Sequence, residues 1–298
     1  MSQRLAFSRF IGHNLIMIKR DKAFAAIVTF EIIAILFATF GIWIAYTNDN
    51  IEVSYYDVKD DLIPDEFDGF KIAHVSDLHN RDWDGRAEDL IAAEKPDIIV
   101  VTGDMVDSSD RYFDNSLNFL KEAVKIAPVY YVSGNHEANM TDYDSLEKSF
   151  ENAGATVLND ENAVLQKNGS QINLIGLRDP AFEFEYASDN TVKEHIADVI
   201  NSLSKEGIFN IVLSHRPEYF DVYALTNADL VLCGHAHGGQ IRIGNKGIFA
   251  PGQGFFPEYT AGIHEKNDTF MIVSRGLGDS VLPRVNNMPE LVFVTLKS

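Results

Sequence analysis

Short apolar runs that stop abruptly at polar residues are the feature that most constrains the fold of this chain. The runs KIAHV, IIVV and VYYV lead into SDLH, TGD and SGNHE, and further along NIVL and LVLC lead into SHR and GHAH. A short apolar run without polar alternation is typical of a strand that is buried on both faces. The sequence therefore predicts central strands of a sheet that is covered on both sides.

Helical patterns alternate with these strands. Residues 86–94 place Leu90 and Ile91 on one face, and residues 115–126 repeat apolar residues at helical spacing. Strands and helices in alternation predict βαβ units with parallel strands, an α/β fold, which a strand at residues 53–58 precedes. The chain has 298 residues, of which 46% are apolar, and this is enough for one large core.

The polar residues that follow the strands share one position relative to the sheet. In open α/β sheets, sites form outside the carboxyl ends of the strands, so we expect these side chains to converge on one crevice. They are Asp77, His79, Asp104, Asn135, His136, His215, His235 and His237.

The chemistry of this crevice follows from the residue types. Cys233 is the single cysteine, which excludes an intramolecular disulfide and any multi-cysteine metal site. Carboxylate, amide and imidazole donors suit Mn²⁺, Zn²⁺ or iron and leave the identity of the metal open. The candidate ligands are too many for one ion that must keep an open position, so we expect two divalent ions that share a bridging carboxylate. Two such ions clamp a phosphate and generate a hydroxide nucleophile.

Five blocks carry a resemblance to a known family. They are Asp77-Leu78-His79, Gly103-Asp104, Gly134-Asn135-His136-Glu137, His215 and Gly234-His235-Ala236-His237. In this order the blocks resemble those of the calcineurin-like metallophosphoesterases. The resemblance implies a four-layer αββα sandwich, in which two mixed β-sheets are flanked by helices. It also implies a metal-dependent phosphoric ester hydrolase.

The resemblance further implies a role for each site residue. One metal would take Asp77, His79, His237 and the bridging Asp104, and the other would take Asp104, Asn135, His215 and His235. A metal-bridging hydroxide would attack phosphorus, and His136 would protonate the leaving group. Asp107 resembles the carboxylate that orients this histidine in several branches, although an ordinary loop carboxylate is an equal alternative.

Departures from the family pattern narrow the branch. Ser108 and Ser133 occupy positions at which Ser/Thr protein phosphatases carry arginine, and Asp107 stands where purple acid phosphatases carry a metal-bound tyrosine. The chain most resembles the membrane-associated bacterial branch, which is YkuE-like. This resemblance favours phosphodiester or phospholipid-type substrates of lipid or cell-envelope origin. A non-catalytic envelope-binding protein and a nucleotide phosphodiesterase or nuclease are the alternatives.

Charge divides the chain into three parts. Residues 1–22 sum to +4, and residues 48–298 sum to −22 within a total of −19. Between them, residues 23–47 are almost wholly apolar, and this stretch is long enough to cross a bilayer. Trp43 and Tyr46 lie near its end, where aromatic residues anchor a helix at the membrane interface. By the positive-inside rule, we expect a basic cytoplasmic segment, a transmembrane anchor that attaches the protein to the cell membrane, and an extracytoplasmic domain. The acidity of that domain argues against long nucleic acids as partners.

Two other targeting signals compete with the anchor. A cleaved signal peptide has a shorter apolar core and a small-residue cleavage site, and a twin-arginine signal needs an arginine pair where this chain has Lys19-Arg20. The length of the apolar segment favours the uncleaved anchor.

Residues 238–265 are rich in glycine and aromatic residues. One interpretation is a cap over the metals with Gln240, Arg242 or Tyr259 on the substrate, and the other is a β-hairpin whose aromatic side chains pack on the sheet. Arg216 is a candidate phosphate contact, but an arginine beside a strand end also pairs with structural carboxylates.

Overall fold

The computed structural model describes residues 2–184, 187–278 and 283–298, with side chains from Lys22 onward. The side chains of the basic segment before Lys22 therefore lie outside the described residues. The chain divides into two compact units, of which the first ends at Tyr46 and the second spans Thr47–Ser298.

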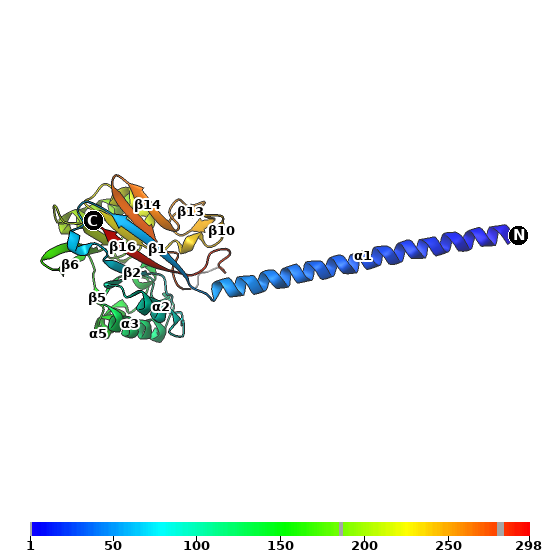
Figure 1. Ribbon diagram of the computed structural model, residues 1–298, viewed down its shortest axis with the longest axis horizontal. Helices are drawn as coiled ribbons and strands as arrows, with labels where there is room; N and C mark the ends of the chain where they lie inside the picture. Colours follow the sequence, from blue (N-terminus) through cyan, green and yellow to red (C-terminus); the bar gives the residue numbers. More distant parts are fainter. Residues whose placement is uncertain (1, 185–186, 279–282) are drawn as a thin grey trace. The chain divides into compact units, whose positions relative to one another are not determined.

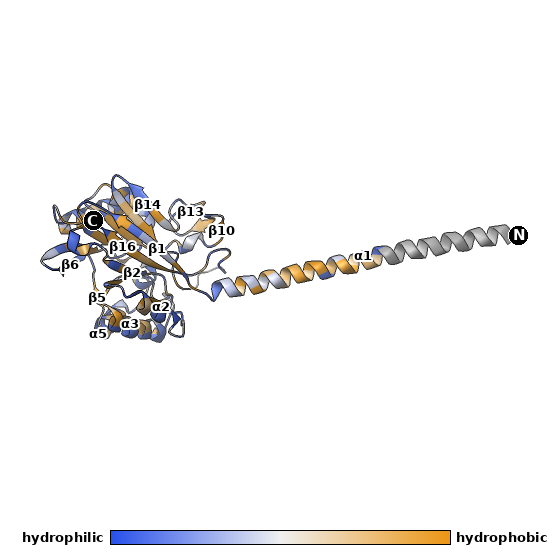
Figure 2. Ribbon diagram, viewed as in Figure 1, coloured by the Kyte–Doolittle hydropathy of each residue, from blue (hydrophilic) through white to orange (hydrophobic). Residues whose placement is uncertain are grey.

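The first unit is a single long helix. Helix α1 runs over Ser2–Asn48, and the most apolar 18 residues within its stretch Lys22–Asn48 have a mean hydropathy of 2.3 and are not buried. In Figure 2 most of the ribbon of this stretch has the orange colour of hydrophobic residues. An exposed apolar helix of this length is long enough to cross a membrane, which agrees with the anchor predicted at residues 23–47.

Two six-stranded mixed sheets form the second unit (Figure 1). In what we call the first sheet the order is β1 (Glu52–Lys59), β16 (Glu290–Lys297), β2 (Lys71–Val75), β3 (Ile98–Thr102), β4 (Val129–Val132) and β5 (Thr156–Val157). In the second sheet the order is β14 (Gly262–Lys266), β15 (Thr269–Val273), β9 (Leu230–Cys233), β8 (Asn210–Leu213), β7 (Ser170–Gly176) and β6 (Glu161–Lys167). Strands β2, β3 and β4 are parallel, as are β7, β8, β9 and β15, so the predicted parallel core is confirmed.

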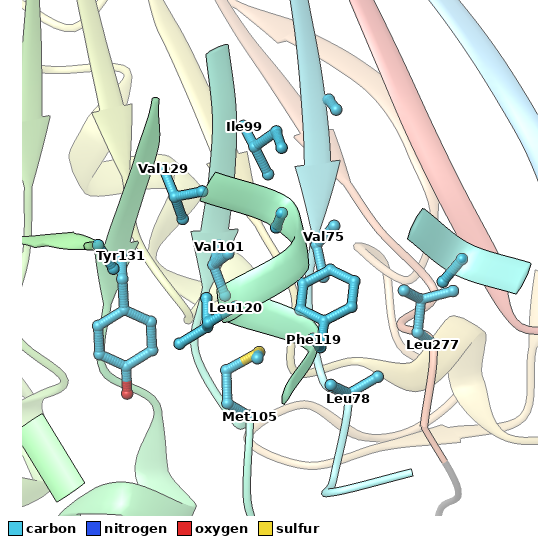
Figure 3. Close-up of a cluster of buried hydrophobic side chains, with 14 of the residues drawn as sticks. Val75, Leu78, Ile99, Val101, Met105, Phe119, Leu120, Val129, Tyr131 and Leu277 are labelled. Atoms are coloured by element: carbon cyan, nitrogen blue, oxygen red, sulfur yellow. The ribbon is translucent and has the colours of Figure 1, made fainter. Parts of the chain in front are cut away.

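Helices cover the outer face of each sheet. The first sheet packs against α2 (Arg86–Glu94), α3 (Asp114–Ile126) and α5 (Tyr143–Ala153), and the second against α6 (Asp189–Leu203) and α7 (Phe220–Tyr223). Figure 3 shows Phe119 and Leu120 of α3 beside Val75 and Val101 of the first sheet. A third buried cluster lies between the sheets and includes Ile72, Val100, Leu213 and Leu232. The four-layer sandwich is therefore confirmed.

Short elements make up the remaining loops. They are the helix α4 (Asn135–Ala138), the 3-10 turns η1 (Asp65–Phe67), η2 (Pro180–Phe182), η3 (Pro217–Tyr219) and η4 (His237–Gly239), and the strands β10 (Arg242–Ile243), β11 (Lys246–Gly247), β12 (Phe249–Ala250) and β13 (Gly254–Phe255). The last four strands form two hairpins. The hairpin interpretation of residues 238–265 is thus right, but Phe249 and Phe255 are exposed and do not pack on the sheet.

Strand periodicity explains why the loops after β2 and β3 carry the site. Val75 and Val101 point toward the helices, whereas Ile72 and Val100 point between the sheets. Beyond each strand end the backbone turns sharply, and Asp77, His79 and Asp104 all adopt positive φ angles near 50°. This left-handed backbone ends each strand and redirects its polar side chains.

Candidate metal centre

The carboxyl ends of five strands bring the predicted ligands together. The structure holds three groups of residues, and in each group the donor atoms lie within 4.8 Å of one another. The groups are Asp77 with His79 and His237, His79 with Asp104 and His136, and Asp104 with His215 and His235. Asp104 belongs to two of these groups, which suits a carboxylate that bridges two cations. A cavity of about 550 Å³ opens over the cluster, and Asn135 and Gln240 also line it.

Asp77 is buried where the loops of both sheets meet. Its carboxylate follows β2 and accepts hydrogen bonds from the backbone N–H of His235 at 3.0 and 3.1 Å. The Nε2 atom of His237 lies 3.3 Å from Asp77 Oδ1 and 3.2 Å from His79 Nε2. Two imidazole nitrogens that face each other beside a carboxylate form a donor set that suits a cation.

Asp104 forms the corresponding contact on the other side of the cluster. His215 Nε2 lies 3.0 Å from Asp104 Oδ2, and His136 donates its backbone N–H to Asp104 Oδ1 at 2.8 Å. His215 donates its Nδ1–H to the carbonyl of Thr102 at 2.7 Å, which directs its Nε2 toward Asp104. Burial lowers the pKa of His215, but Asp104 and Asp77 outweigh it and raise the value to about 10, so a metal ion at Nε2 would replace a proton there.

His235 completes this group through its other nitrogen. Its Nδ1 lies 3.1 Å from His215 Nε2, and its Nε2 lies 3.2 Å from Arg216 Nη1. Burial, followed by the charge of Arg216, holds the pKa of His235 well below its usual value. Burial and the neighbouring His79 have the same effect on the pKa of His237. Neutral imidazole is the form that binds metal.

Asn135 supplies a direct test of whether the cluster fits metals. Its Oδ1 atom is buried and has no hydrogen-bond partner among the described residues. A buried amide oxygen without a partner is costly, and a bound cation would satisfy it. The donor set and this oxygen therefore fit a pair of divalent ions.

His136 and Asp107 lie at the edge of the cluster. The backbone N of Ser108 lies 3.2 Å from His136 Nδ1, and His136 Nε2 lies 4.0 Å from Asp104 Oδ2. Asp107 Oδ1 lies 2.8 Å from His79 Nδ1 and 3.2 Å from His136 Nδ1. The shorter contact means that Asp107 holds His79 more directly than it holds His136.

The remaining predicted contacts divide between the cavity and the scaffold. Gln240 lines the cavity, whereas Arg242 donates to the carbonyls of Gly238 and Asn245, and Tyr259 packs on Phe220. Arg242 and Tyr259 are thus outside the described cavity lining. Arg216 pairs with a structural carboxylate, which is one of the two alternatives that the sequence left open for it.

Asp179 is the partner of Arg216. Two hydrogen bonds of 2.7 and 2.9 Å join its carboxylate to the guanidinium group. Such a fork fixes the plane of an arginine. It leaves Arg216 Nη1 beside His235, and a substrate contact by Arg216 stays a prediction.

Glu137 supports the metal centre, although the sequence marks it only as the last residue of the block Gly134-Asn135-His136-Glu137. Its buried carboxylate accepts the backbone N–H groups of Gly134, Asp104 and Met105 at 2.7 to 2.8 Å, which joins the loops after β3 and β4. Burial and the nearby Asp104 raise the pKa of Glu137 to about 7. A glutamate three residues after Gly134, at the start of a helix, is a capping signal that could have identified it.

Arg284 is the second such residue, and no sequence motif marks it. It is 1% exposed, and it donates to the carbonyls of Arg275 and Gly278 at 2.7 and 2.9 Å. Its Nη2 lies 3.2 Å from His237 Nδ1. The guanidinium thus contacts the ring at Nδ1, whereas Nε2 faces His79 and Asp77, and this contact limits the rotation of the His237 ring.

Comparisons with known proteins agree with this geometry. Residues 70–239 match the family described as Calcineurin-like phosphoesterase. The chain is 34% identical over 264 residues to the metallophosphoesterase YkuE of Bacillus subtilis (strain 168), which covers 83% of this chain and 86% of that protein. It is 31% identical over 252 residues to the phosphodiesterase YaeI of Escherichia coli (strain K12), which covers 80% and 84%. A transmembrane protein with a metallophosphoesterase domain from Danio rerio is 24% identical and covers 79% and 55%.

Proposed function

The chain belongs to the calcineurin-like phosphoesterase family and is a metal-dependent phosphoric ester hydrolase, and we propose that it hydrolyses phosphodiesters at a membrane surface. Members of this family use two divalent metal ions. In our proposal, Asp77, His79 and His237 hold one ion, Asn135, His215 and His235 hold the other, and Asp104 bridges them. The donor set suits manganese, zinc or iron.

The protein's own residues orient and protonate the substrate in this proposal. Two bound ions polarise the phosphoryl group and make water nucleophilic near neutral pH. His136 lines the cavity, and its Nδ1 lies 3.2 Å from the carboxylate of Asp107, which favours a ring that carries protons on both nitrogens. This imidazolium would pass its Nε2 proton to the leaving alkoxide and return to neutral imidazole, which makes His136 the general acid. Asp107 holds His79, and through it the rim of the cavity.

One observation carries the preference for diesters. The described lining of the cavity consists of His79, Asp104, Asp107, Ser109, Asn135, His136, His235, His237, Gln240 and Pro251, and it includes neither lysine nor arginine. A phosphomonoester dianion needs more cationic clamping than a diester monoanion. The name of YaeI, a phosphodiesterase, is consistent with this preference.

The test compares two chromogenic substrates. With Mn²⁺ or Zn²⁺ present, we expect kcat/KM for bis-p-nitrophenyl phosphate to exceed that for p-nitrophenyl phosphate by at least about tenfold. A higher value for the monoester would overturn the diester proposal. No turnover of either ester, with both metals bound, would instead favour a non-catalytic binding protein.

Membrane attachment is the second part of the proposal. The apolar helix Lys22–Asn48 and the transmembrane relative from Danio rerio support it. We propose that residues 1–22 are cytoplasmic, that residues 23–47 cross the membrane, and that residues 48–298 face outward. We expect the intact protein to stay in the membrane fraction after a carbonate wash. We also expect that protease added to intact cells degrades the domain. A domain that is protected from protease would reverse the proposed orientation.

A further inference from the structure

Residues 242–263, which we call the aromatic segment, expose large apolar side chains. Their two hairpins lie side by side (Figure 1), because Ile248 donates its N–H to Ile241 and Phe256 donates to Ile248. Phe249 and Phe255 touch ring to ring, yet Phe255 and Phe256 are 75% and 77% exposed. An exposed group of this kind on a folded domain usually marks an interaction surface.

The backbone of Phe256 supports this interpretation. Its φ angle is +55°, in the left-handed region that bulky side chains avoid. Packing within the domain does not offset this strain, since the ring points into solvent. A glycine or asparagine would adopt the same turn at a lower cost. A strained aromatic residue held outward is better explained by a partner than by the stability of the fold.

Charge on the aromatic segment differs from the rest of the domain. Residues 48–298 sum to −22, whereas residues 242–263 hold Arg242 and Lys246 against Glu258 and therefore sum to +1. An anionic bilayer would repel most of the domain and would accept this part of it.

Hydrogen bonds connect the aromatic segment to the start of the domain. Asn48 directly follows the proposed anchor, and its side chain forms two hydrogen bonds of 2.8 and 3.0 Å with the backbone of Arg284. The next residue, Val285, accepts the N–H of Arg242 at 3.0 Å. The segment is therefore only a few bonded residues from the point at which the chain would leave the bilayer.

We propose that the aromatic segment is a membrane-docking surface that seats the domain on the bilayer. The exposed phenylalanine rings enter the interfacial region, and Arg242 and Lys246 lie at headgroup level. This inference rests on the proposed anchor. Gln240, which precedes the aromatic segment, and Pro251, which lies within it, both line the metal cavity. Docking would therefore turn the cavity toward phosphoesters of lipid headgroups.

Depth-dependent fluorescence quenching tests the docking in the full chain. The native cysteine, Cys233, is buried, so a cysteine introduced at an exposed position can be labelled selectively. Phe256→Cys carries an environment-sensitive dye in vesicles of phosphatidylcholine and phosphatidylglycerol that contain a spin-labelled lipid. The matched control is Gln166→Cys, which is exposed on β6 at the opposite edge of the second sheet from β14. We expect at least threefold stronger quenching at position 256 than at position 166.

Equal quenching at the two positions, in protein that floats with the vesicles, would overturn the docking surface. Phe255→Cys repeats the test where the backbone is unstrained, in case the change at Phe256 disturbs folding. If the unlabelled Phe256→Cys protein forms a disulfide between two copies under a mild oxidant such as copper phenanthroline, and the labelled protein shows no lipid quenching, the surface belongs to a second copy and the proposal is overturned.

The readout separates this inference from the proposed function. Quenching needs no turnover, so a protein that is inactive on diesters would refute the diesterase proposal alone. Protein that fails to float with the vesicles would refute the anchor on which the docking rests.

Discussion

The two sheets contribute different chemistry to the metal centre. The first sheet supplies every oxygen donor, from Asp77, Asp104 and Asn135, whereas the second sheet supplies only imidazoles, from His215, His235 and His237. Each aspartate ligand of the first sheet contacts a group of the second: Asp77 accepts the N–H of His235, and Asp104 contacts the ring of His215. Neither sheet alone offers a complete ligand set, so the site exists only where the two strand edges meet.

Each side also has its own supporting residue. On the first sheet, Glu137 gathers the backbone of the loops after β3 and β4. On the side of the second sheet, Arg284 holds the ring of His237. Loss of a buried group that orients a metal ligand typically weakens metal binding by about 10–100-fold. The comparison therefore predicts that a substitution on the side of either sheet weakens the binding of metal ions whose ligands come from both sheets.

Asp104→Asn should have the largest effect, because this carboxylate serves both groups. We expect kcat/KM to fall by more than about 10³-fold, which corresponds to at least about 4 kcal/mol, and metal content to fall as well. Steady-state kinetics and elemental analysis measure the two. Asp57→Asn, an exposed change on β1, is the control and should retain both values. Full metal content and activity in Asp104→Asn would show that the Asp104 carboxylate does not bridge two metal ions.

Gly234→Ala tests how closely the two sheets approach. A Cβ atom there would collide with Ser76 Oγ and Asp77 Oδ2, although the backbone itself allows alanine. We expect about 2–3 kcal/mol less stability in denaturant unfolding and about 10–100-fold weaker metal binding.

The double variant Ser76→Ala/Gly234→Ala removes one of the two colliding atoms and should recover part of the loss. If Gly234→Ala matches the unaltered protein in stability and metal affinity, the loops do not meet as closely as the structure shows.

Glu137→Gln should damage the side of the first sheet with a smaller effect. Glutamine keeps one acceptor oxygen but turns an amide toward N–H donors, so one or more of them loses its partner. We expect a loss of about 2 kcal/mol in unfolding free energy and about tenfold weaker metal binding. Calorimetric metal titration measures the affinity. Glu147→Gln, on the outer helix α5, serves as the control. Unchanged affinity in Glu137→Gln would show that the loops hold their shape without this carboxylate.

His74→Gln should have the smallest effect, and only at acidic pH. His74 is buried on the inner face of β2 with its Nε2 2.8 Å from Thr102 Oγ1, and burial lowers its pKa from 6.5 to about 3. The unfolded chain binds a proton that the folded protein excludes, so stability falls as the pH drops below 6.5. We expect His74 to cost about 1 kcal/mol between pH 7 and 5.5.

Unfolding of both proteins at the two pH values measures this cost. In His74→Gln the part of the slope that is due to His74 should disappear. An identical pH dependence in the two proteins would show that His74 does not contribute to it.

Much of the site was predictable because it depends on local pattern. Asp77, His79 and Asp104 come directly after buried strands, and parallel strands bring their carboxyl ends to one edge. The capping signal could have identified Glu137 at the start of its helix, but not its hydrogen bonds to the loop after β3. The role of Arg284 was not predictable, because it depends on which groups lie near its side chain after folding. The insertion of β16 between β1 and β2, parallel to β1 and antiparallel to β2, was likewise not predictable, since its pairing joins residues more than 200 positions apart.

The sequence by itself determined the apolar N-terminal helix, the parallel α/β core and the residues that end each strand. These depend on the order of apolar and polar residues along the chain, which sets the burial of each element. The tertiary structure alone decided that Asp77 and Asp104 are completed by the second sheet, and that the aromatic segment holds Phe255 and Phe256 outward. Both outcomes depend on contacts between segments distant in sequence, because a buried carboxylate needs partners and an exposed ring is one that no other segment covers.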